Sequence, residues 1–210
     1  MSFKSHVVAT AATLALFAGS ASAVELAVNG GFETGDFTGW SQFESFPGNQ
    51  TITSDAASGN WAGLITNMQP ASNSLFKQAN LGGNLAAGLE IKISFDAKGS
   101  FAGGGVAFAE VFSEKAGGGT NPPPLLVSLH DKVNANTYTN ISFSYFISPS
   151  GAPGGVTLQL GATTGGATGS MATMYYDNVS IQAVPEPGTY ALMLAGLAGV
   201  GVLAKRRRQA

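Results

Sequence analysis

The sequence predicts an all-β domain, a sandwich of two packed sheets, between two terminal segments of another kind. Several short segments alternate apolar and polar residues with the two-residue period of a half-buried strand. Runs rich in glycine, proline and asparagine separate these segments, and no convincing helical stripe occurs between the termini. The length fits one such domain, since 210 residues less the two ends fall within the usual range of about 100–200.

The first 23 residues, 1–23, have the pattern of a secretory signal peptide. Lys4 gives a positive start, the run VVATAATLALFAG gives a short apolar core, and small residues end the segment at Ala21 and Ala23. This pattern predicts export and cleavage after Ala23, so that the mature chain begins at Val24; a buried N-terminal helix is the alternative. Export usually permits disulfides, but the chain has no cysteine, so core packing or a metal must stabilise the domain.

Residues 24–182 contain the predicted strands. In the segment LEIKISFDAKG, residues 89–99, every second residue from Leu89 to Phe95 is apolar. The same period occurs in residues 139–148, 155–163 and 174–184, whereas residues 105–114 are more continuously apolar, which is typical of a central strand. From these patterns we expect four large apolar side chains in the core: Phe95, Phe108, Phe143 and Leu158.

The charge of residues 24–182 disfavours nucleic acid as a partner. This region has eleven acidic residues against five lysines and no arginine, an excess of six negative charges. Binding to phosphates requires clustered lysine and arginine, which this region lacks.

Residues 183–210 combine three features in a fixed order. They are the tripeptide Pro185-Glu186-Pro187, an uncharged run over residues 188–204, and a basic end of Lys205, Arg206, Arg207 and Arg208. The run lies at the lower limit for a transmembrane helix, about 17–25 residues. Because positive residues stay on the cytoplasmic side, we expect a membrane anchor with the domain outside the cytoplasm.

This ordered pattern resembles a PEP-CTERM sorting signal. The resemblance implies an exosortase as partner, which recognises the tripeptide and cleaves nearby, in a bacterium that makes exopolysaccharide. The protein would then reach the cell surface or the extracellular space. Two prolines hold the tripeptide extended, a shape that a membrane protease can bind. A plain single-pass anchor with an incidental Pro-Glu-Pro is the alternative.

A second resemblance covers the domain. The segment LAVNGGFETGDFTGWSQ, residues 26–42, resembles the opening of galactose-binding-like jelly rolls, which include many carbohydrate-binding modules. The segment YYDNVSI, residues 175–181, is similar to their last strand, and ISFDAKGS, residues 93–100, to a middle strand. The resemblance implies a jelly-roll β-sandwich over residues 24–182. We expect Phe32 and Trp40 to fill its core.

In domains of this kind the first and last strands lie side by side, which would bring Glu33 next to Asp177. Two carboxylates would repel each other unless they are solvated or bridged by a cation. The resembling family often has a structural calcium at this place, and calcium prefers carboxylate and carbonyl oxygens. The expected ligands are Glu33 and Asp177 with backbone carbonyls near Asn29 and Gly31. A hydrogen-bonded structural role for both carboxylates is the alternative.

The residues favour sugar binding over catalysis as the activity of the domain, because no catalytic set can be assembled from them. The main candidates for stacking against a sugar ring are Trp61 and Tyr138. For Trp61, burial in the core is the alternative. Further candidates are Phe43 and Phe46, with a polar loop formed by Asn134, Asn136, Thr137 and Asn140. A sugar site combines an exposed aromatic with a few polar groups.

No catalytic constellation is evident. His130 is the only histidine after the leader, and we expect it on the surface. Glu110 and Glu114 could serve as paired carboxylates for glycoside hydrolysis, but we expect Glu114 to be part of a solvated edge.

The sequence therefore predicts an exported, non-catalytic protein that binds extracellular polysaccharide in the cell envelope or biofilm matrix. A structural matrix or adhesion protein without a glycan pocket is the alternative. A row of two or more exposed aromatics on one concave face would favour the first function, and burial of all large aromatics would favour the second.

Overall fold

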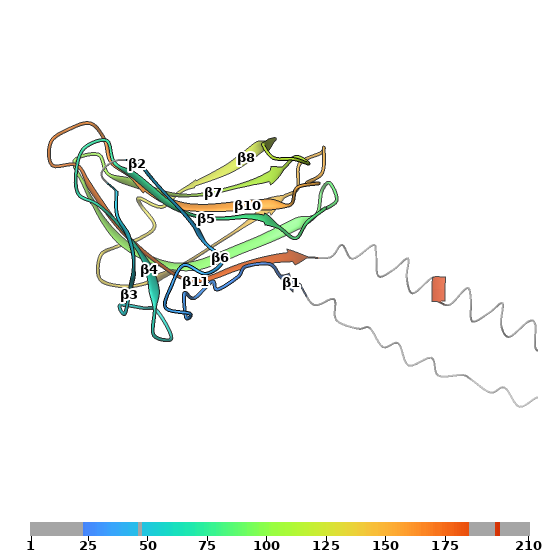
Figure 1. The fold of residues 1–210 in the computed structure, drawn as a ribbon, viewed down its shortest axis with the longest axis horizontal. Helices are drawn as coiled ribbons and strands as arrows, with labels where there is room; N and C mark the ends of the chain where they lie inside the picture. Colours follow the sequence, from blue (N-terminus) through green and yellow to red (C-terminus); the bar gives the residue numbers. More distant parts are fainter. Residues whose placement is uncertain (1–22, 46–47, 185–195, 198–210) are drawn as a thin grey trace, which may run out of the picture.

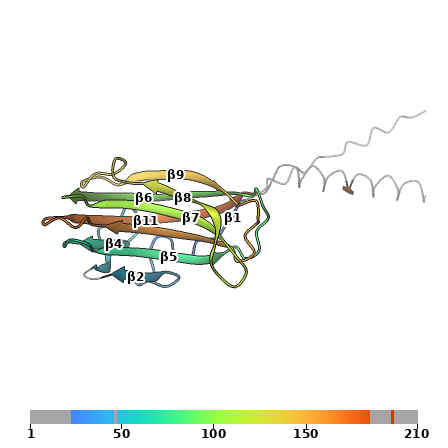
Figure 2. The same ribbon diagram turned by 90° about the horizontal axis from the view of Figure 1, so that it is seen from above.

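The computed structural model describes residues 23–45, 48–184 and 196–197, and these form two packed antiparallel β-sheets (Figures 1 and 2). The predicted signal peptide, Phe46, the Pro-Glu-Pro tripeptide and the basic end lie outside the described residues. Of the predicted transmembrane helix, residues 196 and 197 alone are described, and both are helical. Within the described ranges, no helix has the length and hydropathy needed to cross a bilayer.

Eleven strands occur in the described part of the chain. They are β1 (Val24–Glu25), β2 (Ser41–Ser45), β3 (Gln50–Thr53), β4 (Ala62–Asn67), β5 (Asn73–Leu81), β6 (Glu90–Ala102), β7 (Val106–Glu114), β8 (Thr120–Ser128), β9 (Thr139–Phe146), β10 (Val156–Thr163) and β11 (Met171–Val184). One sheet has the order β3-β4-β11-β6-β9, with β1 paired to β11, and the other has the order β2-β5-β10-β7-β8. The predicted β-sandwich is therefore confirmed.

Alternation within the strands separates the core from the surface as predicted. In β6, Ile91, Ile93 and Phe95 are fully buried between the sheets, whereas Lys92 between them is exposed. Leu158 of β10 is also fully buried, and Phe143 of β9 is half-buried against the core. These side chains alternate because successive residues of a strand point to opposite faces.

Aromatic side chains close one part of the core. Phe32 is fully buried and stacks on Trp40, with 5.2 Å between ring centres and 16° between planes. Phe76 of β5 contacts both rings and also Tyr176 of β11, so the cluster joins the two sheets. The prediction that Phe32 and Trp40 fill the core is confirmed.

The prediction that Phe108 belongs to the core is wrong. In β7 the residues facing the core are Ala107, Ala109 and Val111, and Phe108 lies half-buried on the opposite face. A β-carbon placed on Gly161 of the neighbouring strand would lie 2.5 Å from Phe108 Cζ, so the ring covers this glycine. The error has a physical cause: apolar residues occur on both faces of β7, so the pattern does not identify the inward one.

Candidate functional site

The two carboxylates expected to meet, Glu33 and Asp177, are neighbours across Gly31. A β-carbon placed on Gly31 would lie 3.5 Å from Glu33 Cγ and 3.6 Å from Asp177 Oδ1. The segment before Glu33 is held beside β11, because the Val179 amide donates to the Gly30 carbonyl at 2.9 Å. The beginning and the end of the domain therefore meet at this point.

Glu33 holds one end of a loop over residues 55–61. Its carboxylate accepts the backbone amides of Asn60 and Trp61 at 2.9 to 3.0 Å, and the Asn60 side chain donates to Oε2 at 3.3 Å. The amide of Trp61, followed by that of Asn60, lowers the pKa of Glu33, because both donors favour the charged form. Glu33 thus acts as an anion that caps the loop.

Asp177 holds the other end of the same loop and is fully buried. Its Oδ2 accepts the amides of Ala57 and Ser58 at 2.8 and 3.1 Å, and its Oδ1 accepts that of Asn178 at 2.6 Å. Burial raises the pKa of Asp177, the three amides oppose this rise, and the negative charge of Glu33 adds to it. We call residues 55–61, held by these two carboxylates, the capped loop.

This geometry bears on the calcium expected at Glu33, Asp177 and the carbonyls near Asn29 and Gly31. All four carboxylate oxygens accept N–H donors, and the Asn29 carbonyl accepts the Trp40 indole N–H at 3.1 Å. No group of three or more histidine, aspartate or glutamate side chains suited to a metal occurs in the described ranges. A cation would share these oxygens with the amide donors, and the contacts present fit the hydrogen-bonded alternative. Calcium binding, as expected from the sequence, is untested and is the competing prediction.

Trp61 lies at the end of the capped loop and is 38 % exposed, so the alternative of core burial is wrong. Its indole packs beside Gly35, where a β-carbon would lie 3.5 Å from Nε1. Gly35 has a positive φ of 73°, which suits a residue without a side chain. Contact of Trp61 with a sugar stays a prediction.

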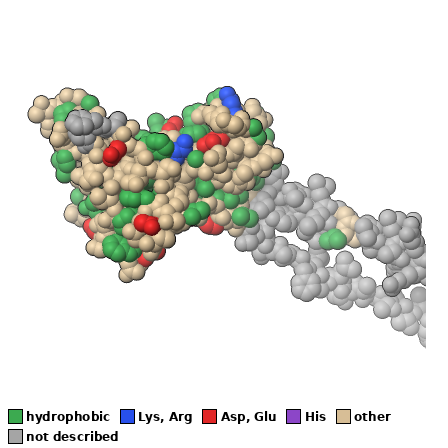
Figure 3. All heavy atoms as spheres, in the orientation of Figure 1, with side chains coloured by type: hydrophobic (Ala, Val, Ile, Leu, Met, Phe, Trp, Pro, Cys, Tyr) green, Lys and Arg blue, Asp and Glu red, His purple; other side chains and the backbone are tan. Residues whose placement is uncertain are grey.

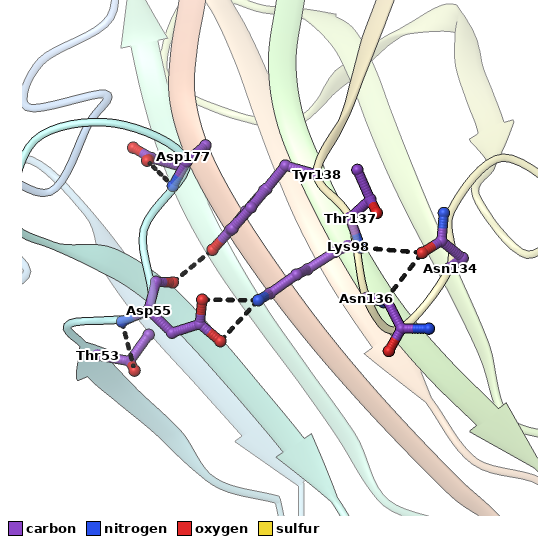
Figure 4. A network of polar contacts seen from close by, with 9 residues as sticks. Thr53, Asp55, Lys98, Asn134, Asn136, Thr137, Tyr138 and Asp177 are labelled. Atoms are coloured by element: carbon purple, nitrogen blue, oxygen red, sulfur yellow. Dashed lines mark hydrogen bonds and ion pairs between the residues drawn. The ribbon is translucent and has the colours of Figure 1, made fainter.

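Tyr138 belongs to a cluster around Lys98 on the outer face of the six-stranded sheet (Figure 4). The Lys98 ammonium lies 4.8 Å from the ring centres of both Tyr138 and Tyr175, and it forms an ion pair with Asp55 at 2.6 Å. The Tyr138 hydroxyl donates to the Asp55 carbonyl at 2.5 Å. Burial, followed by the charge of Asp55, raises the pKa of Tyr138. The Tyr138 hydroxyl and one face of its ring thus already contact other residues of the protein. Contact of Tyr138 with a sugar stays a prediction.

The polar loop before β9 is closed partly on itself. Asn134 Oδ1 accepts the amides of Asn136 and Thr137, each at 2.9 Å (Figure 4). Asn140 donates from Nδ2 to Asp96 Oδ1 at 2.8 Å. These contacts hold the segment that carries Tyr138.

The outer face of the five-stranded sheet carries a group of side chains that the sequence analysis did not predict to lie together. The register forms two rows across the strands: Ser41, Lys77, Gln159, Glu110 and Leu126 in one, and Phe43, Leu75, Gly161, Phe108 and Ser128 in the other. These residues point outward, because their strand neighbours Phe76, Leu160 and Ala109 are fully buried. We call the two rows the platform. In Figure 3 the upper outline of the molecule dips over this sheet.

The platform combines apolar surface with free polar groups. Phe43 is 50 % exposed, and the Lys77 ammonium lies 5.8 Å from its ring centre. The Phe108 ring covers Gly161 of the neighbouring strand β10. Among the described residues, neither the Gln159 amide nor the Glu110 carboxylate has a side-chain hydrogen-bond partner. An apolar ring face beside unpaired donors and acceptors can bind a ligand that has both kinds of surface.

The six-stranded sheet has a shallow hollow on its own outer face. It is lined by Lys92, Ile93, Ser94, Ser142, Phe143, Ser144, Ser180 and Gln182. Nearby on the same face, Phe146 is 62 % exposed and pairs with Glu90. This surface offers a matched comparison for the platform.

The possible catalytic residues do not form a paired site. Glu114 is 6 % exposed, so its expected place at a solvated edge is wrong; its carboxylate accepts the Thr157 hydroxyl. Glu110 is the one acidic residue in the two rows of the platform, so no second carboxylate faces it there. His130 is exposed, as expected, and its ring packs 4.9 Å from that of Phe101.

Comparison with known proteins identifies the C-terminal segment. Residues 183–208 match the family model described as the PEP-CTERM protein-sorting motif. No curated protein matches the sequence.

Comparison with solved structures concerns the sandwich. Similar structures include the enzymatically active domain of tailspike protein 4 of bacteriophage CBA120 (13 % identity, TM-score 0.58), which covers 76 % of this chain and 21 % of that chain. TmCBM61 in complex with β-1,4-galactotriose is 15 % identical, with a TM-score of 0.51, and the match covers 76 % of this chain and 99 % of that chain. A third similar structure is that of the CBM22-1–GH10 modules of Clostridium thermocellum xylanase 10B complexed with xylohexaose. The identity is 21 %, the TM-score is 0.50, and the match covers 75 % of this chain and 28 % of that chain.

These likenesses concern the fold, since the identities are low. The chain spans about a fifth of the tailspike chain, 21 %, and nearly the whole of TmCBM61, 99 %. The chain thus carries a PEP-CTERM protein-sorting motif at residues 183–208 and folds as a β-sandwich similar to those of carbohydrate-binding modules.

Proposed function

We propose that the protein is exported, sorted by an exosortase, and binds a polysaccharide of the cell envelope or biofilm matrix without catalysing a reaction. The platform is the observation that carries the binding proposal. Its exposed Phe43 and half-buried Phe108 lie in one row of the same outer face. One exposed aromatic, Phe43, falls short of the two that the criterion requires, so the proposal depends equally on the open polar groups of Gln159 and Glu110 on the same face.

The chemistry of the platform suits a sugar chain. A pyranose ring has an apolar face of C–H groups. One sugar unit of a chain can rest on Phe43 and another on Phe108, because these rings are three strand spacings apart, about 14 Å. The sugar hydroxyls both donate and accept hydrogen bonds, and Lys77, Gln159 and Glu110 together supply donors and acceptors. The rows run across all five strands of the sheet, a length that suits an extended polymer.

The structural neighbours support a carbohydrate as the ligand class. The titles of two of them describe complexes with β-1,4-galactotriose and xylohexaose, and this chain shares their fold. Those sugars are ligands of those proteins. For this chain they support the proposal that a β-linked or similar extended glycan is bound.

The sorting part of the proposal rests on the matched motif. Pro185, Glu186 and Pro187 would be recognised by the exosortase, and residues 188–204 would anchor the chain until processing. Lys205, Arg206, Arg207 and Arg208 would keep the C-terminus in the cytoplasm, since basic flanks stay on that side.

A glycan array tests the binding proposal on the exported domain, residues 24–184. The wild-type domain is expected to bind a subset of polysaccharides, and Phe43→Ala or Lys77→Ala to weaken binding about tenfold, the effect of losing one good contact. Phe146→Ala, on the other sheet, is the matched control and should bind normally. Trp61→Ala tests the site expected from the sequence.

The possible outcomes separate the alternatives. Absence of binding to any glycan would favour the structural matrix or adhesion protein. Loss of binding in Phe146→Ala or Trp61→Ala, with Phe43→Ala unaffected, would place the site away from the platform.

A further inference from the structure

The sorting motif begins inside the folded domain. The matched residues, 183–208, include Ala183 and Val184, which are the last two residues of β11. Val184 is paired with Glu90 of β6. Pro185 is the next residue in the sequence, so no unpaired residue separates the sheet from the Pro-Glu-Pro tripeptide.

Strand β1 secures this end of β11 from its other side. Val24 pairs with Ala183, which also pairs with Ile91 of β6. Ala183 therefore has a neighbouring strand on both edges. Cleavage of the signal peptide after Ala23 would make Val24 the first residue of the mature chain, directly beside the start of the sorting motif.

Glu25 is the residue that fastens β1 to β11. Its Oε1 accepts the backbone amide of Ile181 at 2.8 Å, and its Oε2 accepts the hydroxyl of Ser180. The Leu26 amide adds a hydrogen bond to the Ile181 carbonyl at 2.7 Å. One carboxylate thus holds two consecutive residues of β11, just before the sorting motif.

A peptidase that binds its substrate as an extended chain needs free backbone groups on an edge of that chain. At Ala183 both edges are in use. Because β1 has two residues and both are exposed, its end of the ladder can open at a small fraction of the cost of unfolding. The ladder therefore limits the rate of access and does not block it.

We propose that the β1–β11 ladder controls processing of the sorting motif: Ala183 and Val184 must leave the sheet first, and Glu25 sets how often they do. This inference rests on the proposed sorting by an exosortase. It makes the folded sandwich, through its first and last strands, a determinant of how fast the protein is released from its anchor.

The test uses the full chain with a C-terminal epitope, produced in a host with and without an exosortase, and follows loss of the epitope over time. A short Gly-Ser insertion between Val184 and Pro185 supplies free chain and should speed processing about tenfold, since opening no longer limits it. Glu25→Ala should speed it about fivefold by removing the contacts to β11. Glu25→Gln, which keeps an acceptor oxygen, should stay closer to the wild type.

A cross-link supplies the opposite change. Facing residues of an antiparallel pair lie about 4.5–5.5 Å apart between Cα atoms, within the range of about 4.4–6.8 Å for a disulfide. Because the chain has no cysteine, Val24→Cys with Ala183→Cys can form no other disulfide within one chain, and non-reducing electrophoresis separates any cross-linked dimer. The double variant should be processed at least about tenfold more slowly, with recovery in reductant, whereas each single variant should match the wild type.

Asp36→Ala provides the matched control for Glu25→Ala. Asp36 is also an exposed carboxylate, and its side chain bonds to Thr34 and Thr38 and to no residue of β1 or β11. It should not change the rate. If the insertion and the cross-link both leave the exosortase-dependent rate unchanged, control by the ladder is overturned. If the wild type loses its epitope equally with and without exosortase, the proposed sorting itself is wrong.

Discussion

The capped loop and the platform use polar side chains in opposite ways. At the capped loop, every carboxylate oxygen of Glu33 and Asp177 accepts a hydrogen bond from a backbone amide of the protein itself. On the platform, Glu110 and Gln159 have no side-chain partner among the described residues and lie on the same outer face as the exposed Phe43. The comparison teaches that conspicuous charged residues can be structural, whereas the surface able to bind a ligand is the one whose polar groups are left open.

The largest expected effect is on the free energy of unfolding, and it distinguishes a phenylalanine of the core from one of the platform. Phe95→Ala should lower the free energy of unfolding by about 3–5 kcal/mol, because its ring is fully buried between the sheets. Phe43→Ala, on the half-exposed platform ring, should change it by no more than about 0.5 kcal/mol. Urea unfolding of residues 24–184 measures both. Equal losses would mean that the platform is part of the core.

The next effect tests whether the capped loop is structural. Asp177→Ala removes the acceptor of three backbone amides and should cost about 2–4 kcal/mol, since buried donors without acceptors are expensive. The matched change on the platform, Glu110→Ala, should be nearly neutral in stability. If Glu110→Ala destabilises the domain as much as Asp177→Ala, the contrast between the two regions fails.

A smaller effect concerns pH, and its sign differs between the two capping carboxylates. The pKa of Asp177 is raised, so its contribution to stability is fully present below the usual value of 3.8 and is lost as pH rises through the raised value. The pKa of Glu33 is lowered, so its contribution is present above the usual 4.5 and is lost as pH falls through the lowered value.

Thermal unfolding from about pH 3 to 7 should show these signs as differences from the wild type. The stability advantage of the wild type over Asp177→Asn should shrink as pH rises, and its advantage over Glu33→Gln should grow. Parallel curves for the wild type and both variants would contradict the assigned shifts.

The smallest expected effect is that of calcium. A cation bound only to the folded state at a hundredfold excess over Kd would add about 2.7 kcal/mol. Because amides already occupy the carboxylate oxygens, we expect the melting temperature of residues 24–184 to be the same in calcium and in chelator. A rise in calcium that disappears in Asp177→Asn would instead establish the calcium site expected from the sequence, and the capped loop would have to rearrange around it.

Part of the fold and of the candidate site could be predicted from local pattern. The alternation in β6 identified Ile91, Ile93 and Phe95 as core residues, because the direction of a side chain depends on its position along the strand. In β7 the same reasoning misplaced Phe108, because small alanines rather than large rings face the core there. The nearness of Glu33 to Asp177 came from a resemblance, and no local pattern contains it.

By itself, the sequence determined the strand periods, the inward faces of the regularly alternating strands and the ordered motif of the C-terminal segment. These are local properties of neighbouring residues. Tertiary structure alone decided which carboxylates are satisfied, since Asp177 meets Ala57 across 120 positions, and which side chains of separate strands share one open face. It also decided that Val24 closes the ladder beside Ala183. The physical reason is that a two-residue period fixes where a side chain points, whereas long-range pairing and loop packing fix what it meets.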